Sequence, residues 1–262
     1  MEEMSTVNDT SKYVYCIIES AEPLIFAAVP IGGGQRVFTV HYQDLAAVVS
    51  ESNLKKYTVC REHAIAHQKV LEAVLSERTL LPVRFGTVTE TESDVINFLL
   101  KPRYKELKTL LKHMNDKNQY GLRVLWSDEK QVFKEILEEN SDIKKLKNRL
   151  SQIPTHLSLN QQIELGHMVE AALMEKKEVC QSRVMKPLSK IACEVKENDL
   201  YGNHMFVNAN FLIEKSRQDE FDAMINTLAE SYGSGVLFKY IGPIPPYNFV
   251  EIIVNLKDVR LC

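Results

Sequence analysis

Residues 79–90, TLLPVRFGTVTE, constrain the fold of this chain more than any other segment, because an apolar run lies here between two charged segments with helical patterns. Leucine, valine and phenylalanine favour strands, so we predict a buried β-strand that ends in a bend at Gly86. Alternation along a strand would place three apolar side chains on one face, those of Leu81, Val83 and Phe85. The opposite face would then carry Pro82, Arg84 and Gly86.

This second face is unusual for a sheet. Proline lacks the backbone donor of a strand pair, and glycine lets another backbone approach closely. Arg84 has two interpretations, and the sequence leaves both open. Arg84 is either buried and paired with a carboxylate of the same domain, because charged residues are seldom buried alone, or it binds a partner.

A second unusual segment is residues 242–250, GPIPPYNFV. Its prolines and glycine cannot continue a central strand and favour an extended, polyproline-like path. Tyr247 and Phe249 are then left to pack or to dock. The two segments together supply our candidate partner-binding residues: Pro82, Arg84, Phe85, Gly86, Gly242, Pro243, Pro245, Pro246, Tyr247 and Phe249.

Length and composition limit the class of protein. A chain of 262 residues with 45% apolar and 26% charged residues favours two domains, each with its own core. A mean hydropathy of −0.20 is ordinary for a soluble globular protein, and a net charge of −3 gives no strong electrostatic field for nucleic acid or an anionic membrane. Five cysteines without a CxxC pair indicate free thiols in a reducing compartment. The acidic N-terminus does not resemble a secretory signal and no long apolar run predicts a membrane span, so we expect a cytoplasmic protein.

The order of strand and helix patterns predicts an α+β fold. Residues 1–11 are expected to be loose, and residues 12–117 to form a modified ferredoxin-like sandwich, a small sheet with two helices on one face. Residues 118–246 are expected to form a second α+β domain with long helices, followed by an extended tail at 247–262.

Local signals place several of the elements. Gln43-Asp44 suits the turn of a hairpin, and Thr91 and Asp94 have the spacing of a capping box. A long helical stretch is predicted at 161–198, with a break near Pro187.

Two motifs were weighed for chemistry. His63 and His67 lie four residues apart on a predicted helix, a spacing that binds zinc when a third ligand is near. No glutamate follows His63 and no nearby Cys or His cluster supplies that ligand, so packing at a helix–sheet interface is favoured. The three glycines at 32–34 lack the spacing and following helix of a phosphate loop. We therefore assign no catalytic, metal-binding or cofactor-binding residue.

Two other classes of function remain as alternatives. One is a small-ligand or metal-binding enzyme on a ferredoxin-like scaffold, in which an arginine near the two histidines could bind an anionic substrate. The other is an RNA-binding module, which needs outward-facing aromatic side chains on a basic surface. Phe85 is expected to share a face with Leu81 and Val83, and the chain is acidic overall, so the RNA class is disfavoured.

The two landmark segments, together with AAVVSES at 46–52 and REHAIAHQKVLEAVL at 61–75, resemble the gas vesicle protein F/L family. The resemblance extends from Tyr13 to about Ile253. Many members carry GPWPPY where this chain has Ile244 in place of the tryptophan. The full-length layout and the C-terminal motif favour the F type over the L type.

The resemblance implies an accessory or minor structural protein that binds the hydrophobic gas vesicle shell subunit (GvpA) and assists gas vesicle assembly. It also implies a cytoplasmic protein associated with gas vesicles, contacts with other gas vesicle proteins, and a modified ferredoxin-like domain followed by an α+β domain and a tail. With 26% charged residues, this chain cannot form the bulk of a water-excluding shell. Binding an aggregation-prone partner requires a limited apolar or edge surface surrounded by charge.

Overall fold

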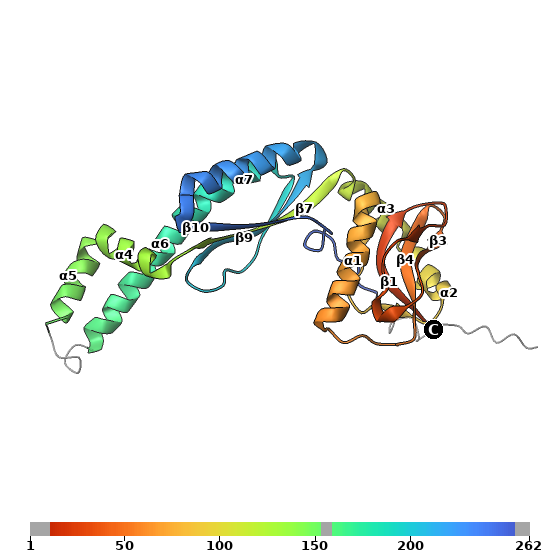
Figure 1. Cartoon of the computed structure of the whole chain (residues 1–262), viewed down its shortest axis with the longest axis horizontal. Coiled ribbons are helices and arrows are strands. Elements are labelled where there is room, and N and C mark those ends of the chain that lie inside the picture. Colours follow the sequence, from red (N-terminus) through yellow and green to blue (C-terminus); the bar gives the residue numbers. More distant parts are fainter. Residues whose placement is uncertain (1–10, 153–158, 255–262) are drawn as a thin grey trace, which may run out of the picture. The chain divides into compact units, whose positions relative to one another are not determined.

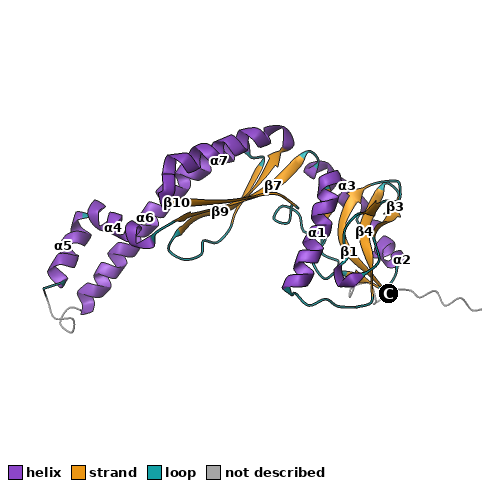
Figure 2. Cartoon of the chain, viewed as in Figure 1, coloured by secondary structure: helices purple, strands orange, loops and turns teal. Residues whose placement is uncertain are grey.

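The computed structural model describes residues 11–152 and 159–254, which form two compact units. One unit combines residues 1–119 with residues 243–262, as far as they are described, and the other consists of residues 120–242. Both units combine helices with a sheet, which confirms the predicted α+β class (Figure 2). No helix in the described ranges has both the length and the apolar composition needed to cross a membrane.

The predicted domain ranges fall only partly on described residues. Of the expected loose N-terminus, only Ser11 is described, and it begins the first strand. The tail is described as far as Val254 and lies outside the described residues beyond it. By its contacts the chain from Pro243 onward belongs with the first unit, while the boundaries predicted from the sequence stay a prediction.

The first unit is built on a sheet with strand order β2-β3-β4-β1-β5, in which β6 also pairs with β1. Its elements are β1 (Ser11–Glu19), β2 (Ile25–Phe26), the 3-10 turn η1 (Ile31–Gly33), β3 (Val37–Tyr42), β4 (Leu45–Ser52), α1 (Arg61–Glu77), β5 (Leu80–Pro82), β6 (Val88–Thr89), α2 (Glu92–Asp94), the π-helical η2 (Val95–Leu100) and α3 (Tyr104–Met114).

Local sequence explains the hairpin and the capped helix. Gln43 adopts a positive φ of 55°, and the two-residue turn places Tyr42 opposite Leu45, which confirms the predicted hairpin. The capping box is confirmed as well. The Thr91 hydroxyl accepts from the Asp94 N–H at 3.1 Å, and the Asp94 carboxylate accepts from the Thr91 N–H at 3.0 Å.

A β-bulge in β1 shapes the core beneath α1. The pairing register of β1 with β4 shifts between Val14 and Cys16. An extra residue in a strand re-aims the side chains around it. As a result, the neighbouring residues Tyr15 and Cys16 join one buried cluster together with Tyr13 and Ile18.

Helices cover both faces of this sheet, whereas the sequence pattern predicted two helices on one face. α1 lies beside β1 (Figure 1). It contributes Val70, Leu71 and Val74 to the cluster that contains Tyr13. α3 packs against β1 and β5, yet its buried residues lie outside that cluster. The reason is that β1 is apolar on both faces, with Ile17 fully buried as well, so each face requires a cover.

The second unit contains a four-stranded sheet with strand order β10-β7-β9-β8. Its elements are β7 (Lys117–Trp126), α4 (Glu129–Glu139), α5 (Ser141–Leu150), α6 (Leu159–Ile191), β8 (Glu194–Glu197), β9 (Met205–Glu214), the 3-10 turn η4 (Lys215–Arg217), α7 (Gln218–Tyr232), the 3-10 turn η5 (Gly233–Gly235) and β10 (Val236–Ile244). α6 and α7 lie together on one side of this sheet (Figure 1).

One prediction for the second unit was wrong. The long helix does not break at Pro187 but continues to Ile191 and is followed by β8. Val184 and Leu188 on either side of the proline are fully buried, so packing outweighs the loss of one helical hydrogen bond. The prediction that residues 242–250 cannot continue a central strand is not contradicted when β10 extends through Gly242 and Pro243 to Ile244, because β10 is an edge strand. An edge strand tolerates proline, because one side of its backbone has no partner strand.

Candidate functional site

The two landmark segments of the sequence meet in the first unit. A groove of about 500 Å³ lies between the start of α1, the end of β5 and the returning tail. We call it the α1–tail groove. Four predicted partner-binding residues line it: Pro82, Arg84, Phe85 and Tyr247.

The segment at the centre of this groove is not the single strand predicted for residues 79–90. It consists of the short strands β5 and β6, separated by a tight turn. The Arg84 carbonyl accepts from the Thr87 N–H at 3.3 Å and from the Thr87 hydroxyl at 2.7 Å. Gly86 adopts a φ of +81° there, a conformation that side chains with a Cβ rarely adopt.

This turn changes the environment of Phe85. The predicted alternation grouped it with Leu81, but it packs against the core cluster that contains Leu80. Its ring meets the His67 ring edge to face, with centroids 5.4 Å apart. Phe85 therefore forms part of the groove and supports its floor.

Arg84 is exposed, so the buried, paired interpretation of this arginine is wrong. Within residues 11–152 and 159–254, its guanidinium has neither an ion pair nor a hydrogen bond. Its backbone is fixed, because the Arg84 N–H donates to the Ile252 carbonyl at 3.0 Å. The turn thus fixes the backbone of Arg84 and places an exposed cationic side chain at the edge of the groove.

The tail supplies one wall of the groove and covers the end of the free edge of β5. Ile252 forms a parallel bridge with Val83, and its N–H donates to the Pro82 carbonyl at 3.3 Å. Ile252 is fully buried. The tail is also fixed at Asn248, whose side-chain oxygen accepts from the Gln119 amide at 2.7 Å.

His67 forms the buried floor of the groove, with 5% of its surface exposed. Its Nδ1 lies 3.0 Å from the hydroxyl of Tyr13, and that hydroxyl accepts from the Gly86 N–H at 3.0 Å. The geometry lets either the Tyr13 hydroxyl or the Nδ1–H donate in this contact. Burial lowers the pKa of His67 to about 4, so the ring is neutral at pH 7.

The packing interpretation of the histidine pair therefore fits the structure. His67 stacks on Tyr15 at 5.6 Å, and His63 meets Tyr57 edge to face at 5.2 Å. Among the described residues, no three His, Cys, Asp or Glu side chains are grouped closely enough to hold a metal ion.

The other candidate residues do not line the groove. Pro245 and Pro246 are buried, and the Pro246 carbonyl accepts from the Val250 N–H at 3.0 Å, which closes a turn. Phe249 is half-buried, and Pro243 is exposed on β10. Gly242 lies on the same strand, where an added Cβ would come within 2.3 Å of the Tyr120 ring.

The groove residues that the sequence did not single out as partner-binding include Val59, Gln68 and Glu251. Val59 stands just before the N-cap Cys60, where an apolar residue commonly signals packing onto the first turn, yet it is 83% exposed here. Gln68 and Glu251 had no such signal, since polar residues on a helix and a tail are common.

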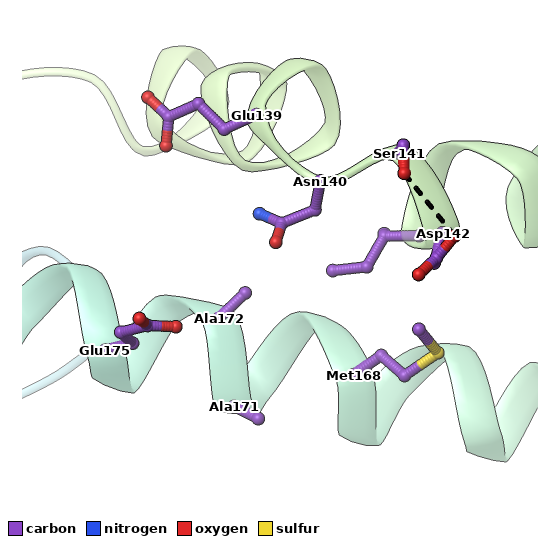
Figure 3. Close-up of a pocket in the computed structure, with 9 residues that line it drawn as sticks. Glu139, Asn140, Ser141, Asp142, Met168, Ala171, Ala172 and Glu175 are labelled. Carbon is purple, nitrogen blue, oxygen red and sulfur yellow. Dashed lines mark hydrogen bonds between the residues drawn. The ribbon is translucent and has the colours of Figure 1, made fainter.

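A second hollow lies in the other unit, between the α4–α5 corner and α6 (Figure 3). Ile143, Met168 and Ala172 line it, with acidic side chains at its rim. Two of its polar groups have structural partners: the Asn140 amide donates to the Ile136 carbonyl at 2.9 Å, and Glu139 pairs with Lys176 at 2.9 Å. We assign no function to this hollow.

The fold and the groove define a class of protein first. It is a two-unit α+β protein whose C-terminal tail returns to the first sheet and forms a largely apolar groove beside one arginine. The comparisons with known proteins then show which family the chain belongs to.

Residues 11–251 match the family described as gas vesicle synthesis protein GvpL/GvpF. The chain is 27% identical over 220 residues to gas vesicle protein F of Nostoc sp. (strain PCC 7120), which covers 83% of this chain and 89% of that protein. It is 29% identical over 245 residues to gas vesicle protein F of Streptomyces sp. (strain CB03234), with 92% and 100% covered. The crystal structure of the gas vesicle protein GvpF from Anabaena sp. PCC7120 superposes with a TM-score of 0.84 at 25% identity, covering 93% of this chain and 99% of that one. The chain belongs to the GvpL/GvpF family, and its role is related to gas vesicles.

Proposed function

We propose that this protein binds the hydrophobic shell subunit of gas vesicles and assists their assembly, with the α1–tail groove as the contact surface. The proposal gives the chain a binding role in the cytoplasm, in association with gas vesicles, and no reaction. Its main support is that the two unusual segments of the sequence converge on one groove in the first unit.

The chemistry of the groove supports an apolar occupant that carries a carboxylate. The apolar side chains of Val59 and Tyr247 are exposed at its border, with 83% and 41% of their surfaces accessible. Arg84 adds a cation without a partner in the described ranges, and a carboxylate from the occupant would complete a bidentate pair.

Docking into the groove is a better mode than strand addition at β5. Strand addition needs an open edge, but the tail already occupies this one through Ile252 and Val83. An amphipathic helix or a short apolar loop needs no free backbone groups, so the groove can accept it with the tail in place.

Co-purification of the full-length chain with the shell subunit tests this proposal. We expect Arg84→Glu and Tyr247→Ala each to weaken the association about tenfold, because each removes a central contact of the groove. Lys105→Glu is the matched control, since it makes the same charge change at an exposed position of α3.

Circular dichroism would establish that each variant is folded. If folded Arg84→Glu and Tyr247→Ala both retain the affinity of the wild-type protein, the groove is not the contact surface. If the wild-type protein does not bind the shell subunit at all, the proposed function itself is wrong.

A further inference from the structure

The outer edge of β10 forms a second surface, in the unit that does not contain the groove. β10 is the outermost strand of its sheet and pairs with β7 alone in the strand order. It is nine residues long. A strand in this position presents unpaired N–H and C=O groups, to which another extended chain can add.

The two sides of β10 differ in chemistry. Val236, Phe238 and Tyr240 pack against the core beneath α6 and α7. The alternate residues face the other way: Leu237 is 49% exposed and Ile241 is 58% exposed, with exposed Lys239 between them. The exposed side therefore has the pattern apolar, cationic, apolar.

Lys239 has no ion pair or hydrogen bond within the described parts of the chain. The exposed apolar side chains beside it also lack a cover there. An added strand with an acid at its centre and an apolar residue two positions away on each side would pair with Lys239 and cover the exposed apolar side chains.

A second copy of this chain is a poor occupant for the same surface. In an antiparallel self-pair, the register that sets Leu237 against Ile241 also sets Lys239 against Lys239. Like charges directly opposite each other destabilise a strand pair. A shift by two residues would set Leu237 against Pro243, which has no backbone donor.

We propose that the β10 edge binds an extended segment of a partner protein in which apolar residues flank one Asp or Glu. The added strand runs along residues 236–241 and ends there, because Pro243 cannot donate to it. This proposal does not depend on the α1–tail groove, since it concerns different residues of the other unit.

The test uses the full-length chain and the acetylated, amidated heptapeptide Thr-Val-Thr-Glu-Thr-Val-Thr with a fluorescent label. We expect saturable binding by fluorescence anisotropy and slower hydrogen exchange at the amides of residues 236–241. A control peptide with lysine in place of glutamate should bind about tenfold more weakly, because an attractive cross-strand pair becomes a repulsive one.

The protein variant Lys239→Glu should reverse this preference and favour the lysine peptide. Lys215→Glu, at an exposed residue of η4, should leave it unchanged. The proposal is overturned if neither peptide slows exchange in β10, if the protection falls in the first unit instead, or if Lys239→Glu does not reverse the preference. These outcomes are distinct from those of the groove test, because neither Arg84 nor Tyr247 takes part.

Discussion

The two sheets of this protein treat an exposed edge in opposite ways. In the first unit, the edge of β5 is covered by the chain itself, because Ile252 bridges to Val83. In the second unit, the edge of β10 has no partner strand among the described residues and carries Lys239 at its centre. Edge strands can pair with strands of other chains, so folded proteins cover them or place charged residues and proline on them.

The difference shows how a chain can expose apolar surface and remain folded. At the covered edge, the tail forms hydrogen bonds with the backbone groups of Pro82 and Arg84, so they cannot pair with another strand. The groove beside it therefore presents mainly side chains. At the open edge, the backbone groups remain accessible. The charge of Lys239 limits which strand can add, and Gly242-Pro243 limits how far along β10 that strand can pair. According to the two proposals, the first surface would select its partner by shape, and the second would select by register and charge.

The largest expected effect is at the end of the open edge. Gly242 has a φ of +149°, and an added Cβ would lie 2.3 Å from the ring of the buried Tyr120. We expect Gly242→Ala to lower the free energy of unfolding of the second unit by about 4 kcal/mol, from overpacking and backbone strain together.

The fluorescence of Trp126, the single tryptophan of the chain, reports urea unfolding of this unit alone. Gly235→Ala is the control, because nothing lies within 4 Å of its added Cβ. Equal stability of the two variants would show that the end of β10 is not fixed in this way.

A somewhat smaller effect is expected when the covered edge is weakened. Ile252→Ala removes a fully buried side chain and should destabilise the first unit by about 3 kcal/mol. Its neighbour Ile253 is 42% exposed, so Ile253→Ala should have little effect. Hydrogen exchange at the Arg84 amide measures the opening of this edge, and similar rates in both variants would argue against tail coverage.

The pH dependence of stability should also differ between the two regions. The pKa of His67 is about 4 in the folded protein and near 6.5 in an unfolded chain, so the unfolded state takes up the proton first as the pH falls. Stability of the first unit should therefore decrease from about pH 6.5 toward pH 4, by about 2 kcal/mol between pH 7 and pH 5.

Hydrogen exchange of α1 amides across this pH range, corrected for the intrinsic exchange rates, measures the loss. His67→Gln should flatten the dependence, whereas His63→Gln on the same helix should preserve it. An unchanged slope in His67→Gln would remove the buried ring as the cause.

The smallest effect belongs to a site unrelated to either edge. Thr91→Ala removes the side chain that accepts from the Asp94 N–H and should cost about 1 kcal/mol of first-unit stability. Thr109→Ala, at an exposed position in α3, serves as the control. If Thr91→Ala opened the β5 edge as much as Ile252→Ala does, the two effects would not be local and the comparison of edges would fail.

Elements with a complete local signal could be predicted from the sequence. The β3–β4 hairpin followed from Gln43 and Asp44, and the capping box from the spacing of Thr91 and Asp94. Such signals act over a few residues, so they need no knowledge of the rest of the chain.

The candidate site could be predicted only in part. The sequence identified Pro82, Arg84, Phe85 and Tyr247, because proline, glycine and a cation are unusual within apolar segments. It placed Gly242 in the same set, although that glycine is explained by the Tyr120 ring. The exposure of Arg84 could not be predicted, since it depends on a turn at Gly86 that interrupts the expected alternation.

The sequence by itself determined the mixed fold class, most of the short-range elements and the family, because each is carried by residue types at fixed spacing. The tertiary structure alone decided that the tail returns to β5, that helices cover both faces of the first sheet, and that α6 continues through Pro187. These features depend on contacts between residues far apart in the chain. Burial of such contacts can outweigh local preferences of about 1 to 3 kcal/mol, so no short window of sequence reveals them.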